Sequence, residues 1–404
     1  EYVLATGDAS VKPGLERLAM AIARGQSGVG TWGHAFARPE GNLNGYGCMN
    51  QPGIVLTLAM VIAREAGVRS PDLDRAIARS ERFLQWYVGK GAIPYGDHSP
   101  WPDHDDNGKC SSAAVLFDLL GRGDAASFFS RMATAAHAER EWGHTGNFFN
   151  VLWALPGVSR AGRDATGAYL AETAWWYDLA RDHEGRFTHQ GIPGEPDKDQ
   201  YGGWDMTGAM LLAFALPDQR LALTGRRPST AARLTGADLA ETIAAGPWNF
   251  WDGQETIYDP RDTAELMAGI ASWSPAVRLR SARALAKKTA VPLDVLIARL
   301  ADKRPETRYG ACAAIRFLGP RGDAAADTLR GLLRSADPWD RVMAAEALVE
   351  MSDRVRNESL VPLLEVILRR PDDPADPRRC SLGPLAEVLF KPGPGQREPR
   401  SILA

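Results

Sequence analysis

The sequence predicts an all-α protein built in two parts, and three observations support this fold class. Within residues 10–250, small apolar stretches alternate with amphipathic stretches whose apolar residues recur every three to four positions. Glycine-rich turns separate these stretches. Further along, the pattern changes to steps of 30 residues (275 to 305) and 33 residues (305 to 338), which is typical of stacked helix pairs.

The change of pattern predicts the domain boundaries. It lies near Gly253, after the aromatic and turn-rich stretch PWNFWDGQ. We therefore expect one domain at 1–253 and an array of helical repeats at 254–390. The stretch 391–404, which begins KPGPGQREPR, has the composition of a linker or a disordered tail.

Composition excludes several classes of function. With 404 residues, 45% of them hydrophobic and 24% charged, the chain can bury sizeable cores. A net charge of -3 gives no reason to expect a nucleic-acid partner. No run of 18 apolar residues occurs, so we expect no membrane span. The opening EYVLATGD does not read as a leader in which basic residues precede an apolar run. The cellular location therefore stays open, and a secreted or periplasmic protein whose leader has been removed fits equally well.

A short repeat organises the first part. Four apolar runs, GIVL, AVLF, NVLW and AMLL, overlay when one position of each is placed in register. The positions in register are Gly53, Ala114, Asn150 and Ala209, and six positions upstream of them stand Gly47, Gly108, His144 and Gly203. Cys48 and Cys110 each follow one of these glycines, so they form either a disulfide between neighbouring helix starts or two separate buried thiols.

The helices of the first part follow in a regular order. An amphipathic helix is expected at 11–24. Short turns between helices favour antiparallel neighbours, so inner and outer helices should alternate. Predicted inner helices, apolar on most faces, cover 47–66, 108–120, 147–155 and 206–215. Predicted outer helices, each with one charged face, cover 71–88, 124–138 and 161–182, and a further helix is expected at 231–245.

The turn after the first helix carries a family resemblance. Gln26, Gly30 and Trp32 have the spacing of the QW repeat of squalene and terpenoid cyclases, and they also resemble the related repeats of protein prenyltransferase subunits. Those families fold as an α/α toroid, in which inner and outer helices alternate around a central cavity. The resemblance covers roughly residues 10–250 and implies the same fold for the first part.

The second part resembles HEAT repeats. Each predicted repeat has a proline that starts a helix, an arginine three positions later, and an alanine six positions after the arginine. The arginine is expected on the solvated or ladder face, and the alanine allows helices to pack closely. The positions are Pro275, Pro305 and Pro338; Arg278, Arg308 and Arg341; and Ala284, Ala314 and Ala347. The whole chain resembles an uncharacterised bacterial family that joins a toroid to HEAT-type repeats, a likeness that implies no particular activity.

The loops that enter the predicted inner helices carry the candidate site. In a toroid these loops open at one end, where helix N-termini favour bound carboxylate, sulfate or phosphate groups. The candidate catalytic residues are Asp105, His144, His189, Tyr201 and Asp205. The candidate substrate-binding residues are His34, Asn44, Asp97, His98, Trp101, Asn147 and Trp204.

These residue types favour an enzyme acting on acidic polysaccharide, since α/α toroids also serve polysaccharide lyases and hydrolases. A lyase needs an imidazole or phenol as base and a group that neutralises the uronate. A hydrolase needs two carboxylates from different loops, for which Asp105 and Asp205 are the natural pair. Tryptophans could stack on sugar rings, although Trp32 and Trp142 fit better as turn anchors. The ligand is then a small molecule or an oligosaccharide in the toroid cavity.

Other interpretations stay open. The run from Asp103 to Asp106 has the D-x-D-D form that resembles the general-acid motif of class II terpenoid cyclases and implies Asp105 as the proton donor. The stretch NGKCSS, the single toroid and the polar mouth depart from that family. A non-catalytic module that binds a protein partner through the HEAT surface is a further alternative.

The loop aspartates also have plainer explanations. No cofactor is predicted, although Asp103 and Asp105 with His98 or His144 could hold a divalent metal such as Zn²⁺ or Ca²⁺. Alternatively, they are solvated loop carboxylates, and Asp106 or Asn107 caps the following helix.

Overall fold

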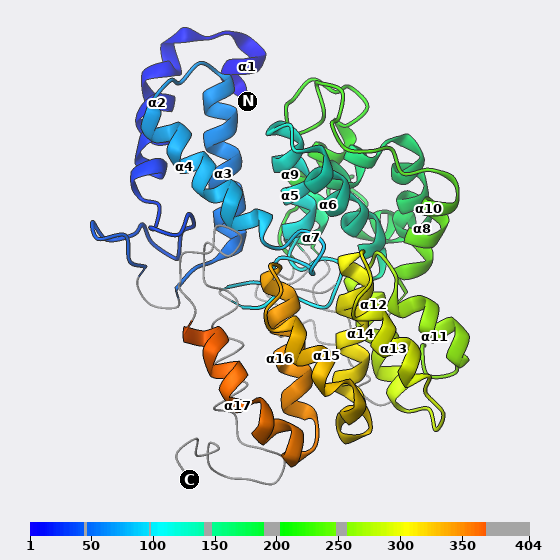
Figure 1. Ribbon diagram of the computed structural model, residues 1–404. Coiled ribbons are helices and arrows are strands. Elements are labelled where there is room, and N and C mark those ends of the chain that lie inside the picture. Colours follow the sequence, from blue (N-terminus) through cyan, green and yellow to red (C-terminus); the bar gives the residue numbers. More distant parts are fainter. Residues whose placement is uncertain (44–46, 97, 141–147, 190–202, 248–256, 369–404) are drawn as a thin grey trace. The chain divides into compact units, whose positions relative to one another are not determined.

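The computed structural model (Figure 1) describes the 404-residue chain except for residues 44–46, 97, 141–147, 190–202, 248–256 and 369–404. The chain divides into two compact units, Glu1–Trp248 and Asn249–Ala404. The predicted boundary near Gly253 and the predicted tail at 391–404 lie outside the described residues.

Unit 1 is helical throughout its described residues, which form no strand beyond three isolated β-bridges. Every helix expected from the sequence is present, with ends shifted by a few residues. The helices are α1 (Tyr2–Thr6), α2 (Lys12–Arg24), α3 (Asn50–Glu65), α4 (Pro71–Gln85), α5 (Lys109–Leu119), α6 (Gly123–Ala135), α7 (Phe148–Val158), α8 (Arg163–Ala180), α9 (Thr207–Phe214) and α10 (Gly236–Ala245), with 3₁₀ turns η1 (Ala9–Val11), η2 (Ala136–Glu139) and η3 (Ser159–Ala161).

Two helices show how the sequence separates inner from outer positions. In α4, Ser70 caps the first turn by accepting a hydrogen bond from Asp72 N, and Pro71 stands where its missing N–H has no partner to lose. The buried residues of α4 fall on one face only. In α5, by contrast, every residue except Leu119 is buried. The small side chains of α5 allow this, because neighbours can approach from all sides.

The helices of unit 1 form two layers. Helices α3, α5, α7 and α9 pack in that order, each against the next. Helix α2 packs on α4. Helices α6, α8 and α10 pack on one another. Gly157 of α7 shows how closely the first layer packs, since a Cβ there would lie 2.6 Å from Ser111 Cα of α5. Over the described residues, the helices predicted as inner therefore pack on one another in sequence order, as do three of those predicted as outer or additional, α6, α8 and α10.

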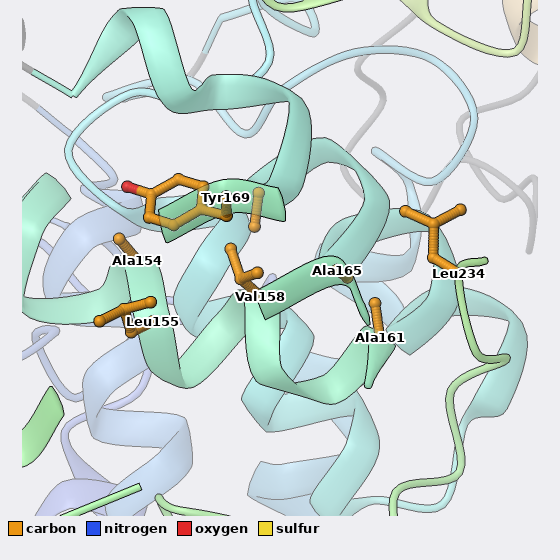
Figure 2. Close-up of a cluster of buried hydrophobic side chains, with 8 residues drawn as sticks. Ala154, Leu155, Val158, Ala161, Ala165, Tyr169 and Leu234 are labelled. Carbon is orange, nitrogen blue, oxygen red and sulfur yellow. The ribbon is translucent and has the colours of Figure 1, made fainter. Parts of the chain in front are cut away.

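A core cluster joins α7 to α8. Figure 2 shows the buried hydrophobic side chains of this cluster, which come from α7, η3, α8 and the segment after α9. The bend between the helices uses Gly162, whose φ of 102° is strained for other residues. The labelled cluster consists of Ala154, Leu155, Val158, Ala161, Ala165, Tyr169 and Leu234.

Residues 216–235, here called the base segment, run past the C-terminal ends of the inner helices. Asp118, at the end of α5, accepts hydrogen bonds from Thr230 N (2.6 Å) and Thr230 Oγ1 (2.9 Å). Arg160 of η3 pairs with Asp118 (3.1 Å) and donates to Ala222 O (2.9 Å). The base segment therefore holds the ends of α5 and α7 together through a buried ion pair.

The base segment also reaches the first helices of the chain. Glu65, at the end of α3, pairs with Arg226 at 3.2 Å and with Arg227 at 2.6 Å. The carboxylate of Glu1 accepts from Ala222 N (3.1 Å) and Leu223 N (2.9 Å). The base segment, near the end of the unit 1 sequence, therefore contacts both the first residue of the chain and the end of α3.

Unit 2 is an array of helix pairs. Helices α12, α14 and α16 begin at the three predicted prolines, and α12 packs on α14 and α14 on α16. The helices are α11 (Thr263–Ile270), α12 (Pro275–Ala286), α13 (Leu293–Arg299), α14 (Pro305–Leu318), α15 (Ala326–Leu332), α16 (Pro338–Glu350) and α17 (Asp353–Leu368), with the 3₁₀ turn η5 (Gly319–Ala325) before α15.

The repeated arginine does more than face solvent. Arg278 is only 3% exposed, and burial lowers its pKa to about 10. In each repeat the arginine Nη1 donates to the carbonyl oxygens six and five residues earlier, in the turn before its own helix. The acceptors are Ser272 and Trp273 for Arg278, Asp302 and Lys303 for Arg308, and Ser335 and Ala336 for Arg341.

One arginine also forms an ion pair between neighbouring repeats. Arg308 Nε lies 3.0 Å from both carboxylate oxygens of Asp340, and Arg308 Nη2 lies 3.0 Å from Asp340 Oδ2. Ser335 Oγ adds a hydrogen bond to the same carboxylate at 2.8 Å. The ladder part of the prediction is therefore correct for Arg308, whereas the solvated alternative is wrong for Arg278.

The repeat register can be tested by truncation. Leu285, Ile315 and Leu348 each follow the repeat alanine and are fully buried. Replacing any one of them with alanine should lower the free energy of unfolding by about 2 to 5 kcal/mol, because a cavity replaces the lost side chain. Chemical denaturation of the full chain measures this. Val361→Ala, at an exposed position, is the control, and losses below about 1 kcal/mol at all three buried positions would contradict the register.

Candidate functional site

The structure describes seven of the twelve predicted site residues. Asn44, Asp97, His144, Asn147 and Tyr201 lie outside the described residues. Of the others, Asp105 and His189 are buried, whereas His34, His98 and Asp205 are exposed. Asp105 thus belongs to a buried polar cluster, whereas most of the other described members lie on the surface.

Asp105 is the centre of the buried cluster. Its Oδ1 accepts from Asp106 N and Cys110 N, each at 2.8 Å. Its Oδ2 accepts from Ser111 N (3.1 Å), Ser111 Oγ (2.7 Å) and Arg140 Nη1 (3.0 Å). Five donors therefore surround a carboxylate that caps the first turn of α5. This geometry favours a structural role for Asp105 and moves the capping role from Asp106 or Asn107 to Asp105.

A second carboxylate, Glu139 of η2, holds the same loop. Glu139 Oε2 accepts from His104 N (2.9 Å) and Asp105 N (3.0 Å), and Glu139 Oε1 lies 3.1 Å from His104 Nδ1. Sequence analysis missed Glu139 and Arg140. The signal was the charged run ERE that interrupts an otherwise apolar stretch after α6.

Two tyrosines adjoin this cluster, Tyr169, which is buried, and Tyr177, which is partly buried. Arg140 lies over the ring of Tyr169, 5.4 Å from the ring centre, and the side chains of Tyr169 and Tyr177 share a hydrogen bond. Burial raises the pKa of Tyr177 well above its ordinary value and also raises the pKa of Tyr169. Both phenols therefore stay protonated at neutral pH and act as hydrogen-bond donors rather than as bases.

The two cysteines near the cluster form no disulfide. Cys48 and Cys110 are separate buried thiols, as one of the two predicted alternatives has it. Burial, and then the negative charge of Asp105, raise the pKa of Cys110 well above its ordinary value. The thiol therefore stays protonated and is a poor nucleophile or metal ligand.

Within the described ranges, no group of three or more His, Cys, Asp or Glu side chains is arranged to hold a metal ion. The oxygens of Asp105 are already engaged by protein donors. A divalent metal held by Asp103 and Asp105 would have to displace those donors.

The exposed part of the site starts with a short hairpin before α9. Thr188 and Asp205 form an antiparallel bridge, His189 N donates to Trp204 O (2.9 Å), and Gly203 N donates to His189 O (3.0 Å). The backbone thus holds His189 beside Trp204, whose side chain is 53% exposed. Asp205 comes directly after this tryptophan.

A matching hairpin precedes α5. Ala92 and Trp101 exchange both backbone hydrogen bonds, at 2.9 and 2.8 Å, and Trp101 is 41% exposed. Asn50, at the start of α3, donates to Pro94 O (2.8 Å) and Gly96 O (3.0 Å) and so fixes the hairpin to that helix. Exposed tryptophans therefore stand on two entry hairpins.

Trp32 has the anchoring role predicted for it. It is buried, and its Nε1 donates to Ile22 O at 3.0 Å. Gln26 of the same turn donates to Ala76 O (2.9 Å) and Ser80 Oγ (2.8 Å) in α4. The Gln-Gly-Trp turn thus joins α2 to α4. Trp142, the other predicted anchor, lies outside the described residues.

The hydrogen bonds of Asp205 favour its ionised form. Its Oδ1 accepts from Thr207 N at 2.8 Å. Hydrogen bonds from the Thr207 side chain and backbone lower the pKa of Asp205 below its ordinary value. A glycosidase needs one carboxyl with a raised pKa, so neither Asp105, which accepts five hydrogen bonds, nor the ionised Asp205 fits the acid role.

The fold and the site together define an all-helical protein that joins a layered helical unit to HEAT repeats. HEAT repeats match residues 263–349 and 293–378. Residues 1–225, more than half of the chain, match the family described as Domain of unknown function (DUF6288), and the chain belongs to that family. No curated protein and no solved structure matched the chain. Among the described helices, none is long and apolar enough to cross a membrane.

The structural role of Asp105 gives a stability prediction. Asp105→Asn should lower the free energy of unfolding by about 3 to 5 kcal/mol, because it leaves the buried guanidinium of Arg140 without its partner. Chemical denaturation measures the loss, and Asp124→Asn at an exposed position of α6 is the control. An unchanged unfolding free energy for Asp105→Asn would contradict the structural role.

The environment of Asp205 gives a pH prediction. Its folded pKa is lowered, so the stability from its hydrogen bonds is present above the unfolded pKa and is lost as the pH falls through the folded value. Carbon-13 NMR titration should find Asp205 below the ordinary aspartate pKa of 3.8. Thr207→Val should raise the pKa, whereas Thr166→Val on α8 should not. Identical titrations in all three proteins would refute the assignment.

Proposed function

We propose that unit 1 is an α/α toroid that binds acidic oligosaccharides at the end where its inner helices begin. The order of packing from α3 through α5 and α7 to α9 supports the toroid. The base segment supports it as well, because Glu1 and Glu65 contact the residues that follow α9. A ring in which the last helix returns to the first needs such contacts.

The exposed tryptophans of the two entry hairpins carry the proposal. Trp101 pairs with Ala92 in an antiparallel bridge, and a loop then leads into α5. Trp204 comes directly before Asp205, which forms the other bridge, and a turn then leads into α9. Large exposed aromatic rings on a fixed backbone provide flat faces for sugar rings, and burying them against a ligand removes apolar surface from water. The C-terminal ends of α3, α5 and α7 share the base segment, so the hairpins belong to the opposite end.

The polar groups near the tryptophans suit an acidic sugar. His98 is exposed in the same loop as Trp101. His189 is held beside Trp204 by backbone hydrogen bonds but is itself buried, so of these two His98 is the imidazole on the hairpins that a ligand can reach. Imidazoles can donate hydrogen bonds to a uronate carboxylate. The inner-helix N-termini add partial positive charge at this end.

If the site is catalytic, β-elimination fits better than hydrolysis. A lyase abstracts the proton beside the uronate carboxylate and expels the leaving oxygen, and it therefore needs a base but no carboxylic acid. The hydrolase pair of Asp105 and Asp205 lacks a proton donor, and the same bonds to Asp105 argue against a terpenoid-cyclase-like acid. Of the imidazole and phenol candidates, His98 and His189 are described, and His144 and Tyr201 lie outside the described residues.

A second candidate function rests on unit 2. HEAT arrays commonly present an extended surface to protein partners, and the match to HEAT repeats at 263–378 favours such a role here. We propose a protein partner for this surface. The two functions are compatible, because one unit can bind the glycan while the other binds a protein.

The stacking role predicts a loss of binding. The double variant Trp101→Ala, Trp204→Ala should bind uronate oligosaccharides about tenfold more weakly, since each aromatic contact contributes roughly 0.5 to 1.5 kcal/mol. Isothermal titration with oligogalacturonate and oligoalginate measures this. Trp175→Ala, an exposed tryptophan on α8, is the matched control. Equal weakening in the control and the double variant would exclude stacking at the hairpins.

The same samples report on catalysis. β-elimination creates an unsaturated uronate, which ultraviolet absorbance detects directly. Product formation by the wild type supports a lyase, and binding without product supports the non-catalytic module. If neither uronate binds, the proposed function of unit 1 fails.

A further inference from the structure

A large cavity lies at the end of unit 1 opposite the entry hairpins. It has a volume of about 1100 Å³ and is bounded by η3, the start of α8 and the base segment. This is slightly larger than the roughly 300 to 1,000 Å³ that is usual for small-molecule sites. A smaller cavity of about 160 Å³ adjoins it and shares Arg160, Arg226 and Arg227 as lining residues.

The lining of the larger cavity is strongly basic. Five arginines line it, and its one lining carboxylate is Asp164. Two further carboxylates, Glu65 and Asp118, line the smaller cavity, so the two cavities together hold five cationic and three anionic side chains. The five arginines are Arg160, Arg163, Arg226, Arg227 and Arg233.

The arginines differ in what they already bind. Arg226 and Arg227 share Glu65, and Arg160 pairs with Asp118. Arg163 and Arg233 are exposed, and neither forms an ion pair with a carboxylate in the described part of the chain. Two cationic groups are thus available to a ligand on the wall of one cavity.

Two further features point to an anion. The 18-residue helix α8 starts at this wall, and its N-cap residue, Gly162, has no side chain to accept from the first-turn amides. Arg160 is 3% exposed, and its Nη1 and Nη2 bind Asp118 and the carbonyl oxygens of Ala222 and Leu223, whereas its Nε has no hydrogen-bond partner among the described atoms. A buried N–H without an acceptor is costly, and an acceptor oxygen brought by a ligand would relieve that cost.

We propose that this cavity, here called the arginine cleft, binds a small molecule carrying two or more phosphate or sulfate groups. Guanidinium groups match tetrahedral oxyanions through paired N–H donors, and the N-terminus of α8 supplies further donors. Arg163 and Arg233 come from different segments, so they suit two charged groups better than one. The ligand oxygens would replace water on both guanidinium groups.

The arginine cleft goes beyond the function proposed for unit 1. The uronate site lies on the hairpins before α5 and α9, whereas the cleft lies where η3 and the base segment meet. The sequence carries a faint signal for it, the runs SRAGRD and TGRRPSTAAR, each rich in arginine and small residues. Neither run has a helical period, so the sequence gives no indication that the two runs lie close together.

The test is isothermal titration of the full chain at constant ionic strength. Pyrophosphate and a disulfated disaccharide are the probes, because phosphate and sulfate groups share one chemistry but come from different molecules. The variant Arg163→Gln, Arg233→Gln should bind the preferred probe about tenfold more weakly, since charged hydrogen bonds contribute roughly 1.5 to 3 kcal/mol. The variant Arg17→Gln, Arg82→Gln removes the same charge from exposed positions on α2 and α4 and should bind normally.

A second variant guards against a loss of folding. Asp164→Asn removes the one carboxylate that lines the larger cavity and should tighten binding of the same probe about threefold, an effect that misfolding cannot produce. Trp101→Ala, Trp204→Ala should leave pyrophosphate binding unchanged, because pyrophosphate has no sugar ring to stack on the tryptophans, and this separates the cleft from the uronate site. A probe preference for pyrophosphate or for the disulfated sugar identifies the source of the anion.

Three outcomes would overturn the proposal. The first is no binding of either probe at millimolar concentration. The second is equal weakening by the two arginine double variants, which would show a general effect of charge. The third is unchanged binding in both Arg163→Gln, Arg233→Gln and Asp164→Asn, which would place the anion elsewhere on the chain.

Discussion

The carboxylate of Asp105 is the contact on which the order of the entry-loop end depends. Removing a charged group from water is costly, and only well-placed donors compensate for the loss. Asp105 has five, from its own loop, from the first turn of α5 and from Arg140 after α6. The loop, the helix start and η2 are therefore positioned together, and none can shift without leaving buried charge unpaired. This constraint explains why an acidic motif that resembles a catalytic one is better understood as a clamp.

Helix α5 has a comparable clamp at its other end. Asp118 binds the base segment and Arg160 there, as Asp105 binds the loop and Arg140 at the start. Because α5 is buried along almost its whole length, two fixed ends make it the rigid reference of unit 1. The two surfaces proposed for ligands, the entry hairpins and the arginine cleft, lie at these two ends. At each of these ends a buried ion pair holds α5 in place.

Local pattern predicted much of the fold and little of the site. The alternation of apolar and amphipathic stretches located α2 to α10, and the three prolines located α12, α14 and α16, because period and helix-start preference act within a few residues. The role of Asp105 could not be predicted, because the sequence motif does not distinguish a free acid from a helix-capping carboxylate whose oxygens all accept hydrogen bonds. Only the structure shows that Arg140 lies beside it. The arginine cleft was missed for a related reason. Arg163 and Arg233 approach one another only through the base segment, which has no periodic pattern to reveal its path.

The arginines of unit 2 bind carbonyl groups of the turn that leads into their own helix, so each clamp is complete within a single repeat. A repeat of about 30 residues that contains all the hydrogen bonds stabilising its turn can be duplicated or deleted without losing them, because they require no partner in a neighbouring repeat. Asp340 is different, since it serves the arginine of the preceding repeat. Duplication of DNA could therefore lengthen such an array readily, while the pairing of Arg308 with Asp340 would keep these two repeats in a fixed order.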